Sequence, residues 1–178
     1  LLSEKVAIKA GIYEKRLCEI LNFNNFYTRG NQLVEMAFSL GTGAFVEYLN
    51  ADGQVVIDYI RADMIYPVSW DNGDVTECAF GTPKTIGGKN VVYIQIHRFG
   101  RKDQGENPDA YYIENVYVDA DSEKEMDPPE EIEEIVNTGS VEPLFQLITP
   151  NICNNIDLDS PLGISVYANA IDEVKGTD

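Results

Sequence analysis

The clearest secondary-structure signal in the chain lies at residues 91–99, which read VVYIQIHRF. Successive side chains of a strand point to opposite faces of a sheet. One face would carry Val91, Tyr93, Gln95, His97 and Phe99, and the other Val92, Ile94, Ile96 and Arg98. β-Branched and aromatic residues supply most of both faces, which is typical of strands. This segment therefore predicts a β-strand, the clearest in the chain.

Shorter segments with the same alternation lie before and after residues 91–99. Turn sequences such as Asp52-Gly53 and Gly87-Gly88 separate them, and short connections of this kind join antiparallel strands. The sequence therefore predicts one antiparallel meander over about Ala44–Val118, with strands at Ala44–Leu49, Val55–Ile60, Met64–Tyr66, Val75–Lys84, Val91–Phe99 and Tyr111–Val118.

Two segments before the predicted meander and one after it have helical periodicity. In the first helix, Ile12–Leu21, the apolar positions are Ile12, Tyr13, Leu17, Ile20 and Leu21. The second, Phe26–Leu40, ends at Gly41, which can adopt the left-handed conformation of a helix cap. We expect it to pack on the sheet through Leu33, Val34, Ala37 and Phe38. A third helix is predicted at about Ser165–Val174.

These elements predict an α+β fold: an antiparallel β-sheet meander with N-terminal helices packed on it and a C-terminal helix. A chain of 178 residues is long enough for a real core, and we expect a single domain over residues 1–178. The chain lacks an initiator methionine and ends abruptly, so we expect it to be a fragment of a longer protein. Its longest apolar runs are too short for a membrane helix.

Charge is distributed unevenly along the chain. The net charge is −17, with 13 Lys plus Arg against 30 Asp plus Glu. Residues 1–102 are neutral, whereas residues 103–178 contain only two basic residues, Lys124 and Lys175. Asp119–Glu134, here called the acidic connector, is the densest acidic segment, and we expect it to be mobile or to project, with a short helix at Glu130–Val136. Such a surface repels nucleic acid and anionic membranes.

The sequence contains no recognisable catalytic motif. His97 is the only histidine, which argues against histidine-based metal clusters. Its place in the predicted strand favours a sheet histidine over a general base. A Cys–His nucleophile pair would require one of three scattered cysteines beside it. Cys18 and Cys78 lie in predicted elements and are expected to be small buried hydrophobes.

Three further segments could be mistaken for ligand sites. Gly41-Thr42-Gly43 follows a helix and precedes a strand, the reverse of the order in a phosphate loop, so a helix cap is expected. Asp157 and Asp159, beside Asn154, lack the glycine and distant glutamate of a calcium loop, so a turn is expected. The basic segment His97–Lys102 at a strand end is expected to be a solvated hairpin tip.

Four stretches of sequence occur in an informative order. Residues 4–8 read EKVAI and precede a helix whose end, residues 19–26, reads EILNFNNF. Residues 37–48 read AFSLGTGAFVEY, residues 60–70 read IRADMIYPVSW, and residues 160–172 read SPLGISVYANAID. This ordered set, which spans nearly the whole chain, resembles the portal proteins of tailed bacteriophages, of the type found in siphophages of Gram-positive hosts.

The resemblance implies that the chain is the wing region of a portal protein, without the crown, stem helices and clip. The family forms a ring, usually a dodecamer, at one capsid vertex. The ring docks the terminase motor, meets capsid and head-completion proteins, and lets DNA through its channel without sequence-specific binding. The implied localisation is the portal vertex of the virion, assembled in the cytoplasm of a bacterial host. The family has no catalytic residue, metal, cofactor or membrane contact to carry over. The acidic connector lies outside the family pattern and is expected to be an insertion.

Two alternatives from other functional classes stay open. A carboxylate-based hydrolase would need paired acids in a cleft, at least one with a shifted pKa. A carbohydrate-binding β-rich module would be supported by an exposed aromatic platform around Trp70, Tyr111 and Tyr112.

Overall fold

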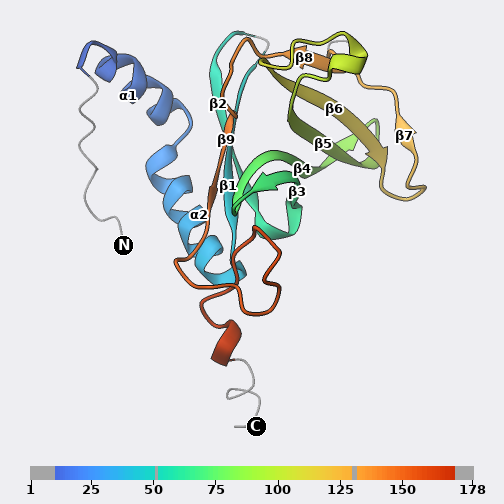
Figure 1. Ribbon diagram of the computed structural model, residues 1–178. Coiled ribbons are helices and arrows are strands. Elements are labelled where there is room, and N and C mark those ends of the chain that lie inside the picture. Colours follow the sequence, from blue (N-terminus) through green and yellow to red (C-terminus); the bar gives the residue numbers. More distant parts are fainter. Residues whose placement is uncertain (1–10, 51, 130–131, 171–178) are drawn as a thin grey trace. The chain divides into compact units, whose positions relative to one another are not determined.

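The computed structural model describes residues 11–50, 52–129 and 132–170 (Figure 1). The chain has an α+β fold and divides into two compact units. Unit 1 comprises residues 1–62 and 145–178, and unit 2 comprises residues 63–144. The expectation of a single domain over residues 1–178 stays a prediction. Residues 4–8 and 171–174, which belong to the segments used for the sequence predictions, lie outside the described residues.

Unit 1 begins with two helices. A 3-10 turn, η1 (Gly11–Tyr13), leads into α1 (Glu14–Phe23), and α2 (Phe26–Leu40) follows. The predicted bounds of α2 are confirmed. Gly41 ends it with φ 97°, and its backbone N–H donates to Ala37 O at 2.7 Å. An L side chain is disfavoured at that φ, so glycine permits the helix to end at this residue.

A three-stranded antiparallel sheet completes unit 1, in the order β2-β1-β9. Its strands are β1 (Gly43–Leu49), β2 (Val55–Arg61) and β9 (Phe145–Ile148). α2 lies against β1 and β2, with Leu33 and Ala37 fully buried and Val34 half-buried. A Cβ on Gly43 would stand 2.8 Å from Leu33 Cδ1, so a larger residue there would force the Leu33 side chain to shift. Phe38, predicted to pack, is 48% exposed because it lies past the edge of the Leu33–Ala37 face.

Unit 2 is built on one six-stranded antiparallel sheet. Its strands are β3 (Ile65–Asp71), β4 (Asp74–Ile86), β5 (Lys89–Phe99), β6 (Tyr111–Asp119), β7 (Glu125–Met126) and β8 (Ile135–Asn137), with 3-10 turns η2 (Ala62–Met64) and η3 (Lys102–Gln104). Neighbours in the order β3-β4-β5-β6 pair directly, and both β7 and β8 pair with β6. The predicted strands within Val75–Val118 are confirmed, with small shifts at their ends.

The prediction of one meander over Ala44–Val118 is wrong, because the strands divide between two sheets. The β1-β2 hairpin pairs with β9, about a hundred residues later in the chain, and not with β3. The 3-10 turn η2 separates β2 from β3, so the two strands do not form a hairpin. The apolar segment that forms β9 has no sequence feature that identifies β1 as its partner.

The predicted C-terminal helix is not formed over its described residues. Only a 3-10 turn, η4 (Ala168–Ala170), is present. Val166 N donates to Phe38 O at 3.0 Å, a partner on another element, and Ala168 N donates to Ser165 O, three residues back. Both amides are therefore used outside the i to i−4 pattern of an α-helix.

The acidic connector runs beside β6, with β7 inside it and β8 directly after it. Met126 lies opposite Tyr117 and Ile135 lies opposite Glu114. Ile135 is nine positions after Met126, whereas their partners on β6 are only three positions apart. The chain between β7 and β8 is therefore six residues longer than a continuous edge strand would need. The predicted helix at Glu130–Val136 is wrong where described, because residue 135 already belongs to β8. Residues 125–126 are held to β6 by strand pairing, and the expectation that the connector is mobile or projects stays a prediction.

Candidate functional site

Cys78 and His97 lie directly opposite each other on β4 and β5. Cross-strand partners share a face of the sheet, so the thiol and the imidazole are neighbours. Both residues are 0% exposed. The His97 ring meets Phe80 edge-on at 5.4 Å between ring centroids, and Tyr111 lies 6.2 Å away. The structure thus forms the one Cys–His juxtaposition that the sequence left open, inside an aromatic core.

Burial determines the protonation of this pair. It lowers the pKa of His97 to about 4 and raises the pKa of the Cys78 thiol to about 12. At neutral pH the imidazole and the thiol are therefore both uncharged. Thiol chemistry requires the thiolate, which an electropositive, partly exposed site would favour. This environment is suited to packing, and the expectations of a buried Cys78 and of a sheet His97 are confirmed.

The opposite face of β5 carries a buried ion-pair cluster. The side chain of Arg98 is 1% exposed; it donates through Nη1 and Nη2 to Glu106 at 2.6 and 3.0 Å, and through Nε to Glu114 at 2.9 Å. These hydrogen bonds raise the pKa of Arg98 and, from the other side, lower the pKa of Glu106 to about 2. Glu106 also accepts from the backbone N–H of Arg101 at 2.8 Å. The cluster therefore fixes the loop between β5 and β6.

This cluster changes the interpretation of the basic segment at the end of β5. Arg98 is paired and buried, so it offers no charge to an outside partner. Arg101 and Lys102 are exposed beside Asp103. The expectation of a solvated hairpin tip therefore holds for those two residues and is wrong for His97 and Arg98, which are both buried.

Backbone fills the space that a phosphate would need at Gly41-Thr42-Gly43. The segment containing Gly163 and Ile164 packs directly on Gly41. Thr42 Oγ1 accepts the N–H of Gly163 at 3.0 Å. The helix cap predicted here is confirmed.

Side-chain oxygens in the Asn154–Asp159 segment serve turns. Asn154 Oδ1 accepts from the backbone of Ile156 and Asp157, and Asp157 Oδ1 accepts from Asp159 N at 3.2 Å. The predicted turn is confirmed. Over residues 11–50, 52–129 and 132–170, no group of three or more His, Cys, Asp or Glu could hold a metal ion.

The aromatic platform considered for a carbohydrate site is not formed. Trp70 is 46% exposed on β3, whereas Tyr111 and Tyr112 are 0% and 8% exposed. The Tyr111 hydroxyl donates to Thr76 O at 3.1 Å across the sheet. These three rings therefore do not supply the exposed platform that would support the carbohydrate-binding alternative.

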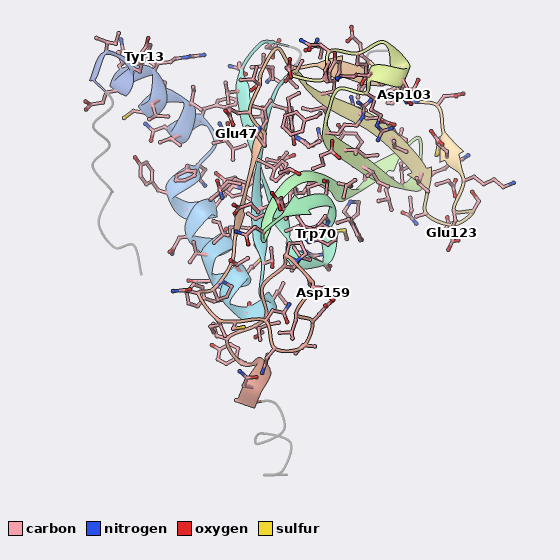
Figure 2. The ribbon with its side chains drawn as sticks, in the orientation of Figure 1. Tyr13, Glu47, Trp70, Asp103, Glu123 and Asp159 are labelled. Atoms are coloured by element: carbon pink, nitrogen blue, oxygen red, sulfur yellow. The ribbon has the colours of Figure 1, made fainter. Side chains whose placement is uncertain are left out.

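The turn η1 and the helix α1 leave several large apolar side chains in solvent. Ile12, Tyr13 and Phe23 are 89%, 70% and 57% exposed, whereas Leu21 is buried. Figure 2 shows Tyr13 at the end of α1 away from α2. The sequence counted Ile12 and Tyr13 among the packing positions, which is wrong because η1 precedes the part of the helix that meets α2. Helical periodicity alone does not show which apolar positions find a partner within the chain.

In the described part of the chain, no helix is long and apolar enough to cross a membrane. Comparison with protein-family models gives no match, and no curated protein matches the chain.

Proposed function

We propose that this chain is the wing region of a bacteriophage portal protein, a structural part of the ring through which DNA is packaged and ejected. In this proposal the full-length protein forms a ring at one capsid vertex, usually of twelve subunits. The ring receives the terminase motor and contacts capsid and head-completion proteins. The chain contributes structure and contact surface to that assembly, and no catalysis.

The observation that carries the proposal is the ordered set of portal-like segments. Two of them, 37–48 and 160–172, are more than a hundred residues apart in sequence and lie in contact in unit 1. Gly163 N donates to Thr42 Oγ1 at 3.0 Å, and Val166 N donates to Phe38 O at 3.0 Å. Segments that resemble one family and also pack on each other support a shared architecture more strongly than their order alone.

Two other features agree with a structural role. The best-formed Cys–His pair is buried and uncharged at neutral pH, as its pKa shifts indicate. The net charge of −17 opposes adhesion of DNA, as a conduit requires. A ring that encloses DNA in its channel needs no phosphate-binding surface in this region.

Immuno-electron microscopy of phage particles tests the proposal. Antibodies raised against the chain are applied to particles purified from the strain that carries the gene, both intact and with detached tails. We expect the label at a single vertex, where the tail joins the head. Immunoblotting of the same particles provides the control. Absence of the chain from purified particles, or label spread over the whole capsid, would overturn the proposal.

A further inference from the structure

The outward face of α1 and its preceding turn carries four exposed side chains. Ile12 and Phe23 are 89% and 57% exposed, and the side chains of Arg16 and Glu19 are 64% and 53% exposed. With 3.6 residues per turn, Arg16, Glu19 and Phe23 fall on one side of α1, away from Leu21, and the turn η1 carries Ile12 directly before that side. This surface therefore has an apolar residue at each end and two side chains of opposite charge between them.

The spacing of these four residues is symmetric. Four positions separate Ile12 from Arg16, three separate Arg16 from Glu19, and four separate Glu19 from Phe23. Two antiparallel copies of such a helix, related by a two-fold axis, place position 12 opposite 23 and position 16 opposite 19. Every residue then faces a suitable partner: Ile12 faces Phe23 of the partner subunit, and Arg16 faces Glu19 of the partner subunit.

We propose that α1 joins two copies of this chain in an antiparallel, two-fold helix pair. Complementarity of the face to itself points to a second copy as the occupant, because a two-fold contact must present the same patch from both sides. The Arg16–Glu19 ion pair within one helix, at 3.8 Å with both side chains exposed, contributes little and competes weakly with pairing between helices.

The contact is expected to be weak and salt-sensitive. Two apolar contacts and two exposed ion pairs make a surface well below that of a standard interface. We expect a dissociation constant in the high micromolar range. A two-fold contact closes with two copies and builds no ring, so the inference goes beyond the proposed function and does not depend on it.

Charge reversal tests the register of the pair. In Arg16→Glu both central positions become acidic, and in Glu19→Arg both become basic, so each variant alone would face two like-charge contacts. We expect sedimentation equilibrium to show at least about a tenfold weaker self-association for each, equal to about 1.4 kcal/mol. An equimolar mixture of the two variants restores both opposite-charge contacts and should associate like the wild type.

Glu35→Arg, a reversal of an exposed acid on α2, is the matched control and should leave association unchanged. Circular dichroism checks that each variant remains folded, which is expected because the substituted side chains are exposed. A wild-type chain that stays monomeric at several hundred micromolar would overturn the proposal. So would a mixture that associates no better than its separate components, because opposite charges would then not join the two copies. Single variants that associate as well as the wild type would indicate a parallel pair, in which position 16 already faces position 16.

Discussion

The Cys78 thiol gives the most direct test at the residue scale. Because burial raises its pKa to about 12, it should not react with a thiol reagent at pH 8 while the chain is folded. Cys153 is exposed and should react quickly, and Cys18 is intermediate in exposure. A chromogenic disulfide reagent counts reactive thiols before and after denaturation. Rapid reaction of all three cysteines in the native chain would contradict the buried pair.

Glu106 predicts a particular dependence of stability on pH. Its pKa in the folded chain is about 2, below its ordinary value of 4.5, chiefly because Arg98 donates hydrogen bonds to it. A depressed carboxyl pKa contributes stability that is fully present above the ordinary value and lost as the pH falls toward the folded value. The free energy of unfolding should therefore decline between about pH 4.5 and 2.

The variant Glu106→Gln removes this titration. We expect it to be less stable than the wild type at pH 7, because Arg98 loses a charged partner, and to show a flatter decline in acid. Urea titrations at several pH values measure both effects. Glu142→Gln, an exposed acid in the same unit, is the control and should follow the wild type. If the free energy of unfolding fell equally steeply in acid for Glu106→Gln and for the wild type, the role given to Glu106 would be refuted.

The sequence predicted the secondary structure of individual residues better than it predicted which residues lie beside them. Alternation along residues 91–99 placed His97 in a strand, and its burial follows from that. Its position opposite Cys78 comes from the register of the β4-β5 hairpin, which the turn Gly87-Gly88 sets and the alternation along residues 91–99 does not. The same holds for Arg98, whose partners lie on a loop and on β6.

The packing of α2 is tested by one substitution and its matched control. Leu33 is fully buried against Gly43, so Leu33→Asp would bury an unpaired charge and should destabilise unit 1 by several kcal/mol. Phe38→Asp, five positions later on the exposed side, should have a small effect. Thermal unfolding followed by circular dichroism measures both. Equal melting temperatures for the two variants would contradict the observed face of α2.

The bounds of helices and strands were predictable where a turn sequence or a capping glycine marks their ends. α2 begins after a turn and ends at Gly41, so its bounds follow from the sequence alone. The C-terminal helix failed because Val166 pairs with Phe38, and a partner so far away in sequence overrides helical periodicity. The short strands β7, β8 and β9 were missed for a related reason: each is defined by the strand beside it.

At the scale of the whole molecule, charge predicts the response to DNA. Binding to a duplex requires Lys or Arg at the phosphates. The chain has 13 such residues against 30 acids, and Arg98 is already paired. We expect no measurable binding to a mixed-sequence duplex at moderate salt in a mobility-shift titration. Salt-sensitive binding at micromolar concentration would instead show that Arg101 and Lys102 outweigh the net charge.

The α+β class and the antiparallel sheet pairing were predictable from composition and periodicity. The division into two sheets was not, because it depends on β9 returning to β1 after the whole of unit 2. Of the candidate sites, the turns and the cap were predictable from local sequence. The symmetric face of α1 was visible as a spacing, but its exposure required the structure.

The surplus of six residues between β7 and β8 makes this edge of the sheet tolerant of changes in length. Replacing residues 127–134 by two residues would let one uninterrupted strand run along β6, with backbone pairing in place of the bonds that Asn115 now makes to Glu133 and Glu134. We expect such a shortened chain to melt no lower than the wild type. Insertions at the same place would lengthen a loop whose closure entropy grows only slowly with length. Over evolutionary time, the acidic connector is thus a point where the chain can gain or lose sequence while its sheet is preserved.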